Sequence, residues 1–134
     1  MNLSRSASLF LIALIALLVA VLQFVAFKFF FYWTLWWYDV MMHGLGGFLI
    51  GSIAAWAYAF ELKQRVKLNT FFWIVGATLL IGILWEVFEY AVGFRLYDGL
   101  YQSYISDTLS DIGMDVAGAL IAYLFFRRSV HKLR

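Results

Sequence analysis

The 134-residue sequence contains no cysteine, no proline and few charged residues. Without cysteine, disulfide bonds and thiolate metal sites are excluded. Charged residues make up 13% of the chain and hydrophobic residues 65%, whereas soluble domains average about 25% charged and about 45–50% apolar residues. This composition is typical of membrane proteins. The net charge is only +2 and no basic cluster interleaves with polar surface, so the sequence does not indicate a nucleic-acid partner.

The apolar residues gather in four long stretches, which occupy residues 7–27, 39–60, 70–93 and 105–126. A helix needs roughly 20 residues to cross a hydrocarbon core of about 30 Å, and each stretch is long enough. No repeat or linker divides the chain. We therefore expect an all-α fold, an integral membrane four-helix bundle forming a single transmembrane domain over residues 1–134. Its partner is the lipid bilayer of a cell membrane, which it crosses as a multi-pass protein.

The basic residues predict the orientation of this bundle. In a four-span arrangement two of the ten, Lys28 and Arg95, fall on one side. The eight on the other side are Arg5, Lys63, Arg65, Lys67, Arg127, Arg128, Lys132 and Arg134. Because cytoplasmic loops are enriched in lysine and arginine, we expect both the N- and C-termini to be cytoplasmic.

Seven of the eight acidic residues lie at the opposite, outer side of the predicted bundle, and Glu61 is the exception. Three of the four stretches contribute ionisable groups there. These are Asp39 and His43 in the second stretch, Glu86 and Glu89 in the third, and Asp107, Asp111 and Asp115 in the fourth. Segments far apart in the sequence thus bring acids to one leaflet of the membrane.

Helical geometry places the members of each set on one face. At about 100° per residue, Asp39 and His43 lie ~40° apart, and Glu86 and Glu89 lie ~60° apart. Asp115 lies roughly 12 Å deeper than the first acid of its helix, near the bilayer midplane. The same three faces continue with small residues, namely Gly47, Gly51, Gly82, Gly118 and Ala122. Since small residues let helices approach closely in lipid, we expect these faces to meet, with tight packing on the cytoplasmic side and a polar chamber on the outer side.

A charged residue at the centre of a membrane helix costs at least about 2.5–3.5 kcal/mol on insertion scales. Protonation of several acids, a water-filled cleft or bound cations would each lower this cost. Bound metal also explains why acids and a histidine gather, because carboxylates with one imidazole suit divalent Mg, Mn, Ca, Zn or Fe. The predicted metal ligands are Asp39, His43, Glu86, Glu89, Asp107, Asp111 and Asp115, and six carboxylates suffice for two ions.

Three of these residues have simpler interpretations that the sequence leaves open. Asp115, the deepest acid, can act as a hydrogen-bonding group between helices instead of a ligand. Asp39 can serve as the N-cap of its helix. His43 can be a packed histidine, although its place one turn from Asp39 favours a ligand.

Three segments resemble known bacterial membrane proteins. The segments "YDVMMHGLGGF", "WEVFEY" and "DTLSDIGMDVAGA" resemble the VanZ-like group and, more closely, the related DUF2238 family. The match covers about residues 37–120 and falls on Asp39 with His43, Glu86 with Glu89, Asp107 with Asp111, and Gly118 with Ala119. The resemblance implies a fold of four to six membrane helices in the bacterial inner or plasma membrane. It links some VanZ-like members to glycopeptide resistance and supplies no reaction.

Two classes of function follow from the acidic cluster. One is a metal-dependent enzyme that acts at the outer face on a lipid or cell-envelope substrate, with catalytic residues that the sequence does not identify. The other is a non-catalytic ion-binding or transport protein, acting as a homo-oligomer, and a structural cluster of acids that share protons remains a further alternative. The cytoplasmic half has no matching polar stripe, which disfavours a through-pore and favours the enzyme.

Overall fold

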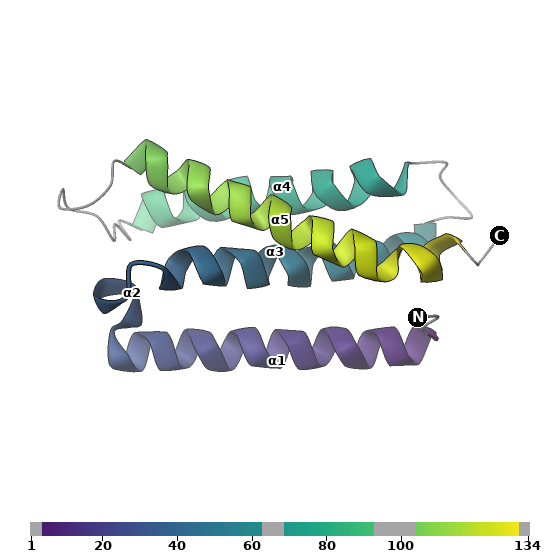
Figure 1. The fold of residues 1–134 in the computed structure, drawn as a ribbon, viewed down its shortest axis with the longest axis horizontal. Coiled ribbons are helices and arrows are strands. Elements are labelled where there is room, and N and C mark those ends of the chain that lie inside the picture. The colour runs from purple at the N-terminus through teal and green to yellow at the C-terminus, as the bar shows by residue number, and fades with distance from the viewer. Residues whose placement is uncertain (1–3, 63–68, 93–103, 132–134) are drawn as a thin grey trace.

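The computed structural model describes residues 4–62, 69–92 and 104–131, and every regular element in these ranges is helical (Figure 1). The elements are α1 (Arg5–Phe29), α2 (Phe31–Thr34), α3 (Tyr38–Ala57), the π-helix η1 (Tyr58–Leu62), α4 (Thr70–Val92) and α5 (Tyr104–His131). Several of the charged residues on which the predicted orientation and the predicted outer acidic side depend lie outside the described residues. They are Lys63, Arg65, Lys67, Arg95, Asp98, Lys132 and Arg134.

Within the described ranges, four helices are long and apolar enough to cross a membrane. They comprise Arg5–Phe29, Tyr38–Leu62, Thr70–Val92 and Ile105–Phe126, and they coincide within a few residues with the four stretches expected from the sequence. A spanning segment must satisfy its backbone hydrogen bonds internally, which a continuous helix does. The predicted helical membrane bundle is thus confirmed at the level of its spans.

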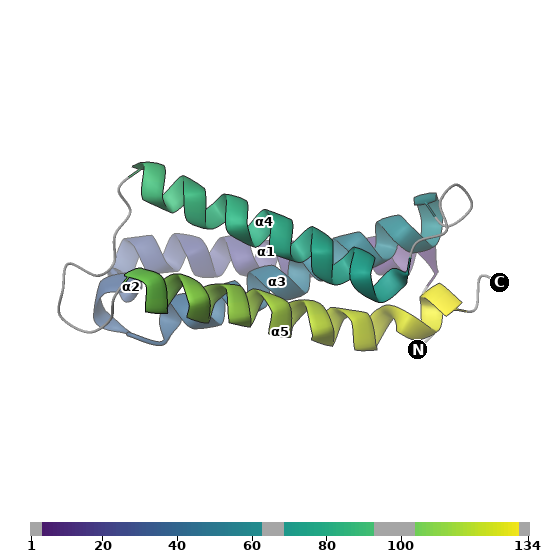
Figure 2. The same ribbon diagram turned by 90° about the horizontal axis from the view of Figure 1, so that it is seen from above.

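Successive spans run in opposite directions, so α1 begins and α5 ends at the same end of the bundle (Figure 1). We call this the termini end, and the opposite end, which carries α2, the α2 end. Helix α3 lies at the centre and packs most extensively against α5, and it also contacts α1 and α4. In Figure 2, seen from above, α4 and α5 lie nearer the viewer, with α3 behind them and α1 farther back. Side chains from α3, α4 and α5 therefore share one interior.

Glycines set the close approach of α3 and α5. A Cβ added at Gly47 would lie 2.6 Å from the Asp115 Cα, and one at Gly118 would overlap the backbone of α3 around Phe48. At Gly51 a Cβ would lie 2.9 Å from the Ala122 Cβ. These distances are shorter than real carbon–carbon contacts, so only glycine fits. The expected meeting of the small-residue faces is confirmed for these two helices.

The aromatic segment after α1 turns the chain back toward α3. Phe30 ends α1 with φ 59°, in the left-handed region, and α2 follows directly. The Tyr32 hydroxyl donates to Gln23 Oε1 at 2.5 Å and the Tyr38 hydroxyl donates to the Leu22 carbonyl oxygen at 3.0 Å. Tyr32 thus ties α2 to α1 and Tyr38 ties the start of α3 to α1, which places Asp39 just inside the α2 end.

The termini end of the bundle is closed by apolar packing. One buried cluster comprises Ala54, Ala55, Ile74, Ala119 and Phe126, from α3, α4 and α5. The Trp73 indole N–H donates to the Ala54 carbonyl oxygen at 3.0 Å, close to where α3 changes into η1. Thus α3, α4 and α5 pack through apolar side chains at the termini end and carry their polar side chains toward the other end.

Candidate metal centre

A cluster of buried ionisable side chains lies in the half of the bundle toward the α2 end. Helix α3 contributes Asp39 and His43 from its first turns, α4 contributes Glu86 from its last two turns, and α5 contributes Asp111 and Asp115. Each of these five is at most 7% exposed. Glu89 lies at the edge and is half-buried. Residues from three helices therefore meet, as the sequence predicted.

His43 is the centre of this cluster. Its Nε2 lies 3.9 Å from Asp39 Oδ1 and 3.8 Å from Glu86 Oε1, and its Nδ1 lies 3.5 Å from Asp115 Oδ1. The three carboxylates come from three different helices. The imidazole is thus within ion-pair distance of one carboxylate from each of α3, α4 and α5.

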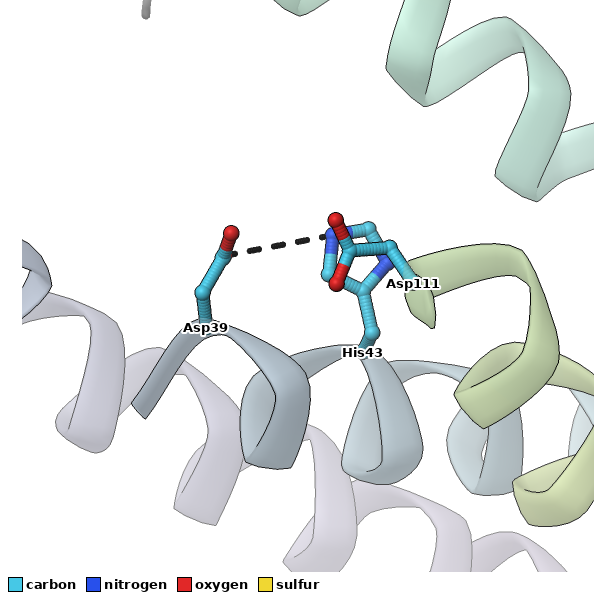
Figure 3. Close-up of side chains that lie close together, drawn as sticks. All are labelled: Asp39, His43 and Asp111. Atoms are coloured by element: carbon cyan, nitrogen blue, oxygen red, sulfur yellow. Dashed lines mark ion pairs between the residues drawn. The ribbon is translucent and has the colours of Figure 1, made fainter. Parts of the chain in front are cut away.

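Two sets of side chains have the geometry to hold a metal ion. In the first set one atom each of Asp39, His43 and Asp111 lies within 4.8 Å of the others, and in the second the same holds for His43, Glu86 and Glu89. Figure 3 shows Asp39 and His43 side by side on α3 with Asp111 reaching them from α5. Both sets contain His43 and therefore overlap. The two sets of carboxylates would thus compete for a single ion bound at the imidazole.

Two of the carboxylates are oriented from outside by hydrogen-bond donors. The Thr108 hydroxyl donates to Glu86 Oε2 at 2.8 Å, and the Trp85 indole N–H donates to Glu89 Oε1 at 2.9 Å. Each donor engages one oxygen and leaves the other for a second partner. Such outer contacts are typical of carboxylates that ligate metals.

Three buried carboxylate oxygens have no hydrogen-bond partner among the described residues. They are Glu86 Oε1, Asp111 Oδ1 and Asp115 Oδ2. A buried polar atom without a partner costs about 1–3 kcal/mol, and more if it is charged, so such atoms need an explanation. Glu86 Oε1 is also the atom that faces His43 Nε2. A proton or a cation between the carboxylates would satisfy these oxygens.

The structure separates two of the predicted ligands from the rest. Asp107 is only partly buried and belongs to neither ligand set within the described part of the chain. Asp115 is also in neither set, and its Oδ1 instead faces His43 Nδ1. The two candidate ligand sets together comprise Asp39, His43, Glu86, Glu89 and Asp111, whereas Asp115 faces the other ring nitrogen of His43.

Sequence reasoning missed the two outer donors. Trp85 precedes Glu89 by four residues and so falls on the same helical face, which the sequence alone could have indicated. Thr108 lies on α5 and contacts Glu86 on α4, and its role depends on how these helices pack. Sequence patterns do not supply that register.

The centre is closed toward the termini end within the described residues. Two buried hydroxyls on α3 and α4 donate to carbonyl oxygens of their own helices, Ser52 to Phe48 and Thr78 to Ile74. Beyond these hydroxyls the buried cluster of Ala54, Ala55, Ile74, Ala119 and Phe126 is apolar and supplies no ligand to an ion that leaves the acidic cluster. The arrangement therefore fits a one-ended site better than a path across the membrane.

The sequence of the chain matches one known family. The family described as a predicted membrane protein, DUF2238, matches residues 2–132. No curated protein and no solved structure matches the chain. The family match thus agrees with the four candidate spans. Its description names no chemistry for the cluster.

Proposed function

The chain belongs to the DUF2238 family of predicted membrane proteins, and from its buried cluster we propose that it binds a divalent metal ion in the outer half of the membrane. The observation that carries the proposal is the convergence of unsatisfied ligand atoms. Glu86 Oε1 and Asp111 Oδ1 are buried without partners, and each belongs to a residue whose ligand set includes His43. A cation in the first set would join α3 to α5 and satisfy Asp111, and a cation in the second would join α3 to α4 and satisfy Glu86.

The donor set narrows the choice of metal. Carboxylates suit Mg, Ca and Mn, whereas imidazole suits Zn, Fe and other transition metals. A site with one imidazole and several carboxylates therefore suits Mn, Fe or Zn best, and Mg and Ca remain candidates for carboxylates alone. With one imidazole shared by both sets, a second ion would be held by carboxylates only.

We propose that the ion supports a reaction at the outer face, on a lipid or cell-envelope substrate. A bound divalent ion would supply a Lewis acid for a phosphoryl or carbonyl oxygen, or lower the pKa of a bound water. The closed apolar packing between α3, α4 and α5 at the termini end supports this over ion transport. A relationship to the VanZ-like group is part of the same proposal and is supported by the three segments that carry the resemblance, whereas a homo-oligomer belongs to the non-catalytic alternative.

The proposal includes the orientation, with both termini cytoplasmic. Reporter fusions within residues 63–68 and after the C-terminus should both report the cytoplasm, because eight of ten basic residues fall on that side. A fusion after Thr34, at the α2 end, should report the opposite compartment. A C-terminal fusion that reports the periplasm would contradict the orientation and place the cluster at the inner leaflet.

Metal binding is tested by replacing Asp111, the most buried of the acids, with asparagine. We expect added Mn²⁺ or Zn²⁺ to raise the melting temperature of the wild type in detergent, because an ion at 100 times its Kd stabilises the folded state by about 2.7 kcal/mol. Asp111→Asn loses a ligand charge. Its melting temperature should therefore rise less with the same ion, and a tenfold loss of affinity removes about 1.4 kcal/mol of the stabilisation.

The matched control is Glu61→Gln, which removes a carboxylate at the termini end, where Glu61 pairs with Arg5. This variant should respond to metal as the wild type does. Elemental analysis of the purified protein supplies an independent measurement. Two results together would contradict the metal centre: a wild-type melting temperature that no divalent ion changes, and an Asp111→Asn variant that is more stable than the wild type in chelator. They would indicate a cluster of acids that share protons.

A further inference from the structure

The two nitrogens of His43 face different carboxylates. Nδ1 lies 3.5 Å from Asp115 Oδ1, whereas Nε2 lies 3.8 Å from Glu86 Oε1 and 3.9 Å from Asp39 Oδ1. A neutral imidazole carries its proton on one nitrogen and offers a lone pair on the other. A proton on Nδ1 thus leaves Nε2 free to bind a cation among the ligand carboxylates.

We infer that Asp115 is a positioning residue, which accepts a hydrogen bond from the Nδ1–H of His43 and thereby directs Nε2 toward the metal. The inference rests on the proposed metal centre. Histidines that bind metals almost always donate their second N–H to a carboxylate, a carbonyl or a water, which fixes the tautomer and the ring orientation. Asp115 Oδ1 lies 3.5 Å from His43 Nδ1, where such a carboxylate is required, and Asp115 belongs to neither ligand set within the described residues.

Two glycines hold the Asp115 carboxylate in place. A Cβ at Gly82 of α4 would overlap Asp115 Oδ2, and a Cβ at Gly47 of α3 would overlap the Asp115 backbone. The carboxylate therefore occupies the space of a missing α4 side chain. This placement explains the glycine one turn before Glu86.

The state of the ring is read by ¹⁵N NMR of histidine-labelled protein in a His131→Gln background, which leaves His43 as the only histidine. In the metal-free protein we expect a proton on Nδ1 with the ¹H and ¹⁵N shifts of a bond to a carboxylate. With Zn²⁺ we expect Nε2 to show the shift of a metal-bound nitrogen. A bare Nδ1, or a metal ion on Nδ1, would overturn the inference.

Three variants separate positioning from general packing. Asp115→Ala removes the acceptor, and Gly82→Ala displaces the carboxylate without changing the acid or the histidine. Both substitutions should change the ¹H and ¹⁵N chemical shifts of the His43 Nδ1–H group. Gly76→Ala is the matched control on α4, because a Cβ there meets nothing within 4 Å, and its spectrum should equal that of the parent. If the parent, Asp115→Ala and Gly82→Ala give the same Nδ1 shifts, Asp115 does not position the ring.

Metal affinity supplies the second readout. Removing such an outer partner typically weakens metal binding by about 10–100-fold, and we expect this loss for Zn²⁺ and Mn²⁺ in both Asp115→Ala and Gly82→Ala. Unchanged affinity in both variants would overturn the inference while the metal centre stands. If the wild type binds neither ion, the proposed function fails instead, and the metal-free spectrum still decides whether Asp115 holds the Nδ1 proton.

Discussion

Replacing His43 with alanine is expected to destabilise the protein by about 3–5 kcal/mol even in the presence of chelator, the range measured when one partner of a buried ion pair is removed. The imidazole is within ion-pair distance of Asp39, Glu86 and Asp115. Without it these buried carboxylates lose their common nitrogen partner. The free energy of unfolding is measured by equilibrium unfolding in detergent or bicelles.

The same variant should also lose its response to metal, because both ligand sets contain His43. Glu89→Gln affects only one set and should keep a weakened response. His131→Ala removes the other histidine, at the far end of α5, and should behave as the wild type. A His43→Ala protein that is as stable as the wild type in chelator would show that the imidazole does not hold the three helices together.

The second large effect is expected at Gly47. In Gly47→Ala the new methyl group would overlap the Asp115 backbone, so α3 and α5 must separate. Overpacking of this kind typically costs about 1–3 kcal/mol, and we expect the upper part of that range because the obstructing atoms are backbone. The displacement of Asp115 should also weaken metal binding. Both quantities are measured on the same purified variant.

Gly46 provides the matched control for this experiment. It lies next to Gly47 on α3, and a Cβ at Gly46 meets nothing within 4 Å. Alanine is favoured over glycine in a helix by roughly 0.5–1 kcal/mol, so Gly46→Ala should be as stable as the wild type or slightly more so. If Gly46→Ala and Gly47→Ala unfold alike, the close contact between α3 and α5 does not limit stability.

The spans were predictable because the physics that selects them is local. A membrane helix needs about 20 apolar residues whatever surrounds it, and helical periodicity alone put Asp39 and His43 on one face. The small residues Gly47, Gly51 and Gly118 likewise indicate the α3–α5 contact from the sequence alone. For these features the sequence pattern and the structure follow from the same constraint.

The division of roles within the cluster was not predictable in this way. Asp107, Asp111 and Asp115 recur at the same spacing, yet only Asp111 joins a ligand set with His43. Which carboxylate reaches which ring nitrogen depends on the rotation of α5 about its axis and on the space that Gly82 leaves on α4. Both depend on contacts between helices, which are set by many side chains together and leave no local signature.

The packing of α3 against α5 has a consequence for how the protein is made. Helix α3 emerges from the ribosome before its main partner, and at 5–20 residues per second the roughly 75 residues from the end of α3 to the end of α5 take about 4–15 s. During this interval Asp39 and His43 must enter the membrane without Asp111 or Asp115. The insertion machinery, or water at the bilayer surface, has to shelter them, so the cluster of ionisable side chains from α3, α4 and α5 is assembled only at a late step of biogenesis.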